Sequence, residues 1–355
     1  MHKARLLAGS VKRHIPDSVF VLCLVEREII PEIGTSPDFD NIVLAKDVWE
    51  GDFDGFIFKH SIVEAATSVK GQFIRYLYKQ FPDEQQFVYL DPDIFVYDDF
   101  VELKALLNKR PIVLCPHLLQ PGNISMELSS VAHGVYNLGF LAVNRMADAV
   151  SFIDWWAERL SQYCYDDKAS GIFTDQKWVS LAPCFFDVEI LKHRGYDFAT
   201  WSLLDCGMTE NNGRCFVKGD PLRFIHFSGY GSLLERCMDD WLPKGDHVFR
   251  RLYSDYEKLH KKSDSDGVSK TPWSYGSFFS GEPIENEVRK KYREHQISLD
   301  NDVNPFGQSN AIILRAPIKT GKKESPAGIC KRVFRVIKYE GVKALFSKVR
   351  KKITR

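Results

Sequence analysis

The feature that most constrains this chain is an alternation of apolar, strand-length runs with amphipathic, helix-length segments through roughly its first 230 residues. This order is typical of an α/β domain, in which helices pack against a sheet. Spacing and apolar runs predict strands at 19–25, 87–90, 112–115 and 135–144, and helices at 60–81, 100–109 and 151–164. No apolar run approaches the ~20 residues that a membrane-spanning helix needs.

Past residue 232 the chain becomes more polar, and the sequence predicts three parts. We expect an α/β domain at 1–232, a C-terminal subdomain packed on it at 233–310, and a linker with a basic tail at 311–355. Eight scattered cysteines without a C-x-x-C pair indicate neither a zinc site nor a disulfide framework, and they favour a reducing cytosol.

The basic tail dominates the charge distribution. The net charge is +1, but residues 327–355 hold ten Lys or Arg against one acid, so the tail carries +9 and the rest of the chain −8. Its apolar stripe predicts an amphipathic helix on an anionic membrane surface, which would place the protein on the inner face of the cell membrane. The alternative is a partly disordered basic tail without a specific partner. Nucleic-acid binding is disfavoured because the body is acidic and has no recognition module.

One acidic pair differs from the others in its setting. The D-x-D pattern occurs five times, at Asp38/Asp40, Asp52/Asp54, Asp91/Asp93, Asp264/Asp266 and Asp300/Asp302. Only Asp91/Asp93, in "FVYLDPDIFVYDD", directly follows an apolar strand and precedes another apolar run. Ligands of open α/β sheets bind beyond the carboxyl ends of the strands. Two carboxylates held there repel unless a cation lies between them, so a divalent metal is the functional interpretation and a capped turn the structural one.

Three further polar segments lie beside apolar structure: "YNLGF" with Asn137 and Gly139, "FTDQKW" with Asp175 and Gln176, and "LRFIHFSGYG" with His226. Glycine permits close approach of a ligand, and amides and carboxylates suit a polyhydroxylated sugar. A histidine at a strand end would suit manganese or magnesium beside two carboxylates. The structural alternatives are a glycine bulge, a capped helix start and a buried core histidine.

The order D-x-D, N-x-G, D-Q-x and H-x-x-G resembles the retaining GT-A glycosyltransferases related to glycosyltransferase family 8. The fuller run, with "YLDPDIFVY", "YNLGFLAVNR" and "HFSG", is similar to a group of bacterial glycosyltransferases linked to surface-polysaccharide synthesis, over about residues 4–306. The resemblance implies a Rossmann-like mixed sheet flanked by helices, with a C-terminal helical extension. It also implies transfer of a sugar from a nucleoside diphosphate to a polysaccharide or lipid-linked glycan, with retention.

The resemblance also implies a role for each matching residue. Asp91, Asp93 and His226 would hold Mn²⁺ or Mg²⁺. Asp175 and Gln176 would be catalytic. Donor contacts would come from Lys70, Asp91, Asn137, Gly139 and Gly229.

The sequence departs from the family pattern in ways that keep two rival functions open. Relatives usually follow H-x-x-G with a Lys-Pro-Trp, which "HFSGYGSLLERC" lacks, so Lys70, Lys218 or Arg236 would have to take that lysine's place. The chain begins in what resembles the family's first helix, so we expect the preceding strand to be missing. A catalytically inactive sugar-binding protein and a nucleotidyltransferase are the alternatives, although the glycine-rich phosphate loop of the latter is not found.

Overall fold

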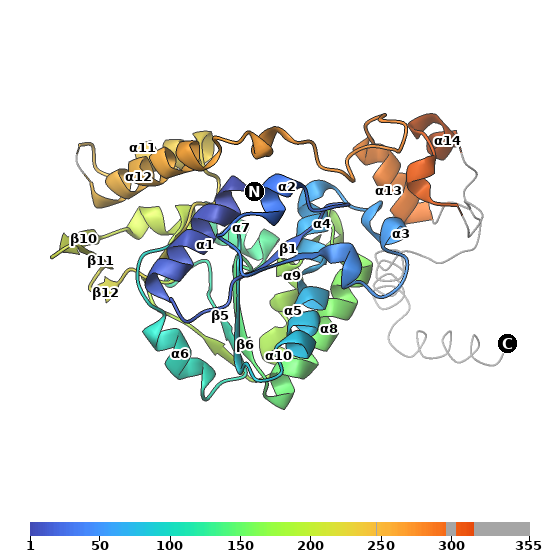
Figure 1. Cartoon of the computed structure of the whole chain (residues 1–355). Coiled ribbons are helices and arrows are strands. Elements are labelled where there is room, and N and C mark those ends of the chain that lie inside the picture. The colour runs from blue at the N-terminus through green and yellow to red at the C-terminus, as the bar shows by residue number, and fades with distance from the viewer. Residues whose placement is uncertain (246, 296–302, 316–355) are drawn as a thin grey trace, which may run out of the picture. The chain divides into compact units, whose positions relative to one another are not determined.

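The computed structural model describes residues 1–245, 247–295 and 303–315 (Figure 1). The chain divides into two compact units, Met1–Gly276 and Ser277–Arg355. Helices α11 (Ser232–Trp241) and α12 (Val248–Ser263) belong to the first unit. The domain boundaries predicted at 232 and 310 stay predictions, and the basic tail at 327–355 lies outside the described residues.

The first unit is built around a mixed four-stranded sheet in the order β3-β6-β5-β9. Its strands are β3 (Gln86–Leu90), β6 (Phe140–Asn144), β5 (Ile112–Leu114) and β9 (Val188–Ile190). Strand β6 runs antiparallel to both neighbours, whereas β5 and β9 are parallel. The α/β class predicted from the alternation of apolar runs is confirmed, and so is the mixed sheet that the family resemblance implies.

Helices cover both faces of this sheet because β6 is apolar on both sides. Leu141 and Val143 pack in one cluster with Trp156 of α8 (Ala147–Tyr163). Phe140 and Ala142 pack in another cluster that includes residues of α1 (His2–His14) and α6 (Val101–Leu107). Successive side chains of a strand point to opposite faces, so a continuous apolar run is what a doubly covered strand requires.

Two shorter pairings extend the first unit. Strand β4 (Ile94–Val96) pairs antiparallel with β13 (Phe224–His226), and β1 (Val21–Leu24) pairs in parallel with β2 (Asn41–Leu44). The remaining described strands are β7 (Asp166–Asp167), β8 (Ile172–Phe173), β10 (Met208–Asn211), β11 (Arg214–Val217) and β12 (Asp220–Pro221).

The segment predicted as one helix at 60–81 forms two, α4 (Ile62–Ser68) and α5 (Lys70–Gln80), with Val69 between them. A capping box of Ser61 and Glu64 begins α4. The other described helices of this unit are α2 (Pro31–Gly34), α3 (Phe53–Ile57), α7 (Ile124–His133), α9 (Gln176–Val179) and α10 (Ala182–Phe185). Short 3-10 turns lie at η1 (Ala45–Asp47), η2 (Lys168–Ser170), η3 (Thr200–Asp205) and η4 (Val268–Lys270).

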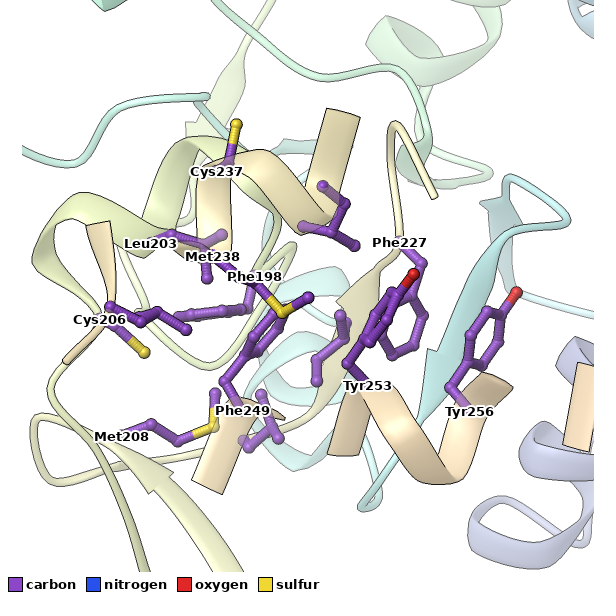
Figure 2. Close-up of a cluster of buried hydrophobic side chains, with 14 of the residues drawn as sticks. Phe198, Leu203, Cys206, Met208, Phe227, Cys237, Met238, Phe249, Tyr253 and Tyr256 are labelled. Atoms are coloured by element: carbon purple, nitrogen blue, oxygen red, sulfur yellow. The ribbon is translucent and has the colours of Figure 1, made fainter. Parts of the chain in front are cut away.

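A third apolar cluster packs α11 and α12 against β13 (Figure 2). Figure 2 shows Phe227 beside Tyr253, and the ring of Phe227 stacks on Tyr256 with centroids 3.8 Å apart. Ile225 also belongs to this cluster. Because side chains alternate along a strand, burial of Ile225 and Phe227 on this side directs His226, which lies between them, to the other side.

The second unit contains α13 (Asn286–His295), α14 (Asn310–Arg315) and the 3-10 turn η5 (Pro305–Gly307). Phe306 of this turn is fully buried and packs against the ring of Phe279, with centroids 6.0 Å apart. Across the described ranges of the whole chain, no helix has the length and apolar character needed to span a membrane.

Candidate active site

Strand pairing brings the polar segments together at one edge. Asp91 follows the end of β3, and its backbone N–H donates to the carbonyl of Gly139, at 2.7 Å, just before β6 begins. Asp93 precedes β4, whose first residue, Ile94, pairs with His226 at the end of β13. Antiparallel pairing places the end of one strand beside the start of its neighbour. Four residues therefore lie close together: Asp91, Asp93, Gly139 and His226.

Asp91, Asp93 and His226 form a group that could hold a metal ion, called here the Asp–Asp–His group. One ligand atom from each residue lies within 4.8 Å of the others. Nε2 of His226 is 3.1 Å from Oδ1 of Asp93. Two carboxylate oxygens and one imidazole nitrogen suit Mn²⁺ or Mg²⁺, so the residues fit the ion that the family resemblance implies.

The side chain of His226 is buried, and its two nitrogens have different neighbours. Nε2 faces Asp93, whereas Nδ1 lies 3.1 Å from Oδ1 of Asn137 and 3.5 Å from Oδ1 of Asp197. Burial disfavours the charged imidazole, yet the Asp93 and Asp197 carboxylates raise the pKa of His226 to about 10. The same imidazole holds the pKa of Asp93 below its usual value against the opposing effect of burial. Asn137 thus orients the ring while Nε2 points into the Asp–Asp–His group.

Lys70 and Asp175 form a buried ion pair beside this group. Nζ of Lys70 is 2.9 Å from Oδ2 of Asp175 and 3.3 Å from Oδ1 of Asp91, and it donates to the carbonyl of Leu138 at 2.9 Å. Burial raises the pKa of Asp175, although Lys70 acts in the opposite direction. Tyr89 donates its hydroxyl proton to the same Oδ1 of Asp91, at 2.6 Å. Lys70 therefore ties the D-x-D and D-Q segments together.

Gln176 is the first residue of α9, and protein groups hold both ends of its amide. Its Oε1 accepts from the backbone N–H of Leu138 at 3.1 Å, and its Nε2 donates to the carbonyl of His133 at 3.1 Å. Asn137 lies 3.5 Å away through its Nδ2. Asn137 and Gln176, predicted separately from the sequence, thus belong to one network.

Gly139 and Gly229, the two glycines predicted to contact the donor, occupy different settings. A Cβ at Gly139 would overlap the imidazole of His226 and lie 2.7 Å from Oδ1 of Asn137. Gly229 has φ +75° in the turn before α11, and its carbonyl accepts from Leu234. Gly139 therefore makes room for a site residue, whereas Gly229 shapes a turn. Donor contact stays a prediction for both.

Sequence reasoning did not assign Asp197 and Lys3 to the site. Asp197 is buried at φ +50°, and burial raises its pKa to about 6. Lys3, in α1, has its Nζ 3.6 Å from Oδ2 of Asp93. Neither residue has a local signal, because Asp197 lies in a loop and Lys3 looks like any polar residue of an amphipathic helix.

The three cations named from the sequence as substitutes for the family's lysine have different surroundings. Lys70 is enclosed by its partners, and Lys218 pairs with Asp205. Arg236 lies within α11.

No family model matches the chain. It is similar to two Bacillus subtilis proteins, both described as uncharacterized. YfnD is 24% identical over 176 residues, which are 49% of this chain and 56% of YfnD. YfnF is 25% identical over 177 residues, which are 47% of this chain and 57% of YfnF. The match therefore spans little more than half the length of each relative.

Solved structures similar to this chain include three glycosyltransferases. Galactosyltransferase LgtC, in complex with donor and acceptor sugar analogs, has a TM-score of 0.38 and 16% identity, covering 71% of this chain and 95% of its own. Mouse xyloside xylosyltransferase 1 has a TM-score of 0.37 and 12% identity, covering 64% and 91%. A glycosyltransferase involved in glycosylation of the major capsid of PBCV-1 has a TM-score of 0.36 and 9% identity, covering 63% and 97%.

Proposed function

We propose that this protein is a metal-dependent glycosyltransferase of GT-A type. It would move a sugar from a nucleoside-diphosphate donor to a hydroxyl of a polysaccharide or lipid-linked glycan. The observation that supports this most directly is the convergence of Asp91, Asp93 and His226 from two strand ends, with ligand atoms within 4.8 Å of one another. Retention of stereochemistry is part of the proposal and rests on the order of the four sequence motifs.

In this proposal Asp91, Asp93 and His226 hold Mn²⁺ or Mg²⁺. When bound, the ion neutralises the negative charge that develops on the departing nucleoside diphosphate. Asn137 supports this arrangement because it holds Nδ1 of His226 and leaves Nε2 directed at Asp93. Orientation of a ligating histidine through its second nitrogen is a general feature of protein metal sites.

Asp175, Gln176 and Asn137 would position the donor sugar. Cleavage of the bond to the leaving group develops positive charge at the anomeric carbon, which fixed carboxylate and amide oxygens stabilise. Gln176 is held at both ends of its amide, and Asp175 is fixed by Lys70, so neither has to reorganise during the reaction. Gln176 accepts from the backbone N–H of Leu138, and Lys70, the partner of Asp175, donates to the Leu138 carbonyl and contacts Asp91. These contacts support a role for both residues beside the Asp–Asp–His group.

Calorimetry with manganese and a panel of nucleoside diphosphates tests the proposal. Wild type should bind at least one of them in a manganese-dependent manner, and Asp93→Ala should remove this dependence. Asp38→Ala is the matched control, because Asp38 belongs to another D-x-D pair and accepts a hydrogen bond from Ser36. Equal manganese-dependent affinities in the Asp93 and Asp38 variants would show that the metal assignment is wrong.

Turnover separates the enzyme from its rivals. A glycosyltransferase should release nucleoside diphosphate from a sugar nucleotide when manganese is present, even with water as the acceptor. Binding without turnover for any donor would favour the inactive sugar-binding protein. Formation of a sugar nucleotide from a nucleoside triphosphate and a sugar phosphate would instead identify a nucleotidyltransferase.

A further inference from the structure

Helix α1 lies along β4, and the two elements cover similar distances between their two contacts. This brings Lys3 to the Asp–Asp–His group. Oγ of Ser10 accepts a hydrogen bond from the backbone N–H of Val96 at 3.0 Å, and Nζ of Lys3 lies 3.6 Å from Oδ2 of Asp93. Seven helical residues span about 10.5 Å, and three strand residues span about 10 Å. The segment from Lys3 to Ser10 therefore matches in length the segment from Asp93 to Val96, so both contacts can form together.

Packing and two tethers hold Lys3 in this position. Leu7, one turn after Lys3 on the same face, is buried in the cluster that contains Ile94 and Val96 of β4. The residues on either side are also anchored: His2 contacts His260 of α12, with Nε2 atoms 2.7 Å apart, and Arg5 pairs with Asp266. The backbone that carries Lys3 is thus fixed beside Asp93.

Lys3 differs from Lys70 in what its ammonium group can still reach. The side chain of Lys70 is 3% exposed and contacts Asp91, Asp175 and the Leu138 carbonyl. The side chain of Lys3 is 32% exposed, and Asp93 is its only carboxylate partner in the described part of the chain. Asp93 uses its other oxygen, Oδ1, toward His226. Lys3 is therefore an accessible positive charge at the Asp–Asp–His group.

We infer that Lys3 binds the diphosphate of the donor and of the leaving nucleoside diphosphate. This rests on the proposed function, since it assumes that Asp91, Asp93 and His226 would hold a cation beside the donor's phosphates. With the Asp93 carboxylate engaged by that cation, the ammonium of Lys3 would be available to pair with a phosphate oxygen of the same ligand. Charged hydrogen bonds of this kind are among the stronger polar interactions in proteins.

The test uses Lys3→Met, which removes the charge and keeps much of the chain length, and Lys3→Arg, which keeps the charge. Lys12→Met is the matched control, because Lys12 lies on the same helix, is 33% exposed and pairs with Asp40 at 2.8 Å. Calorimetry would measure the affinity of each variant for manganese alone, and for a nucleoside diphosphate and its monophosphate with manganese present.

We expect Lys3→Met to weaken diphosphate binding about tenfold, as loss of one charged hydrogen bond predicts. Monophosphate binding should fall less, manganese binding alone should not weaken, and Lys3→Arg and Lys12→Met should stay close to wild type. Equal diphosphate affinity in Lys3→Met, Lys12→Met and wild type would overturn the inference while leaving the proposed function standing. Equal losses of affinity for manganese alone and for the diphosphate would also overturn it, because Lys3 would then act only by shaping the Asp–Asp–His group. A wild type that binds no nucleoside diphosphate with manganese would overturn the proposed function as well.

Discussion

The ammonium group of Lys70 lies 2.9 Å from the carboxylate of Asp175, and each of these side chains is only 3% exposed. Burial opposes the charge on Lys70, yet Asp175 and Asp91 together raise its pKa well above the ordinary value. The pair joins α5, which precedes the D-x-D strand, to the loop that begins α9. Removing either partner of an ion pair this deeply buried should strongly destabilise the fold, because the remaining charge would have neither a partner nor solvent to stabilise it.

Lys70→Met should therefore lower the free energy of unfolding by about 3–5 kcal/mol, since Asp175 would be left buried without its cation. Urea denaturation followed by circular dichroism would measure this loss. Lys79→Met is the control: Lys79 pairs with Glu50 at 3.5 Å, with both side chains about 70% exposed, and should cost no more than about 1 kcal/mol. The double variant Lys70→Met with Asp175→Asn should recover part of the loss. A Lys70 variant as stable as the Lys79 variant would contradict this account.

Gly139 is expected to tolerate no side chain. A Cβ there would overlap the imidazole of His226, and the φ of Gly139 does not lie in the left-handed region, so the constraint is space. Gly139→Ala should cost about 1–3 kcal/mol of stability through overpacking, and it should weaken manganese binding by displacing His226. Gly9→Ala, in α1 with nothing within 4 Å, should instead stabilise the protein by roughly 0.5–1 kcal/mol. Opposite signs for the two variants in urea denaturation are the expected result, and equal effects would refute it.

The two tyrosines Tyr256 and Tyr78 should respond differently to loss of their hydroxyl groups. The Tyr256 hydroxyl is buried in the cluster of Figure 2 and has no hydrogen-bond partner within the described ranges. Tyr256→Phe should be neutral or stabilising, because it removes a buried polar atom without breaking a bond. The Tyr78 hydroxyl donates to the carbonyl of Asn144 at 2.6 Å, so Tyr78→Phe should cost about 1 kcal/mol. Thermal or urea unfolding of both variants would measure the contrast, and a larger loss for Tyr256→Phe would contradict it.

The contact between His2 and His260 predicts a pH dependence of stability. Burial and the neighbouring His260 lower the pKa of His2 from 6.5 to about 4, although Asp264, 3.7 Å from Nδ1, acts in the opposite direction. A histidine with a depressed folded-state pKa favours the folded protein when neutral. Its contribution is therefore complete above pH 6.5 and is lost as the pH falls from 6.5 toward 4.

The unfolding free energy of wild type should consequently fall more steeply between pH 7 and pH 4 than that of His2→Gln. Unfolding curves of both proteins across this range, at constant ionic strength, would show the difference. Parallel pH profiles would mean that His2 titrates alike in the folded and unfolded states.

Most element types were predictable because their signals are short-range. The strand at 87–90 and the helix at 151–164 appear as β3 and α8 within a few residues. The strand predicted at 135–144 begins only at Phe140, since Tyr136 makes an isolated bridge and a turn at residues 138–139 follows Asn137. Periodicity could not place this boundary because the apolar residues continue on both sides of the turn.

The choice of Asp91 and Asp93 among five D-x-D pairs also followed from local sequence, since only this pair lies between two apolar runs. Local order likewise marked Asn137, Gln176 and His226 as polar interruptions of apolar structure. Their juxtaposition was not a local property. It depends on antiparallel pairing of β3 with β6 and of β4 with β13, whose partners lie some 50 and 130 residues apart in the chain.

Lys3 and Asp197 show most clearly that local sequence does not determine which distant side chains come together. Nothing near either residue in the chain distinguishes it, yet Lys3 lies against Asp93, and Asp197 against His226, once the helices and strands have packed. Periodicity encodes which face of an element is apolar, and this is enough to indicate an α/β chain with a polar strand end. Which distant side chains share that strand end depends on burial of the apolar faces against one another, and therefore becomes fixed only as the whole unit folds.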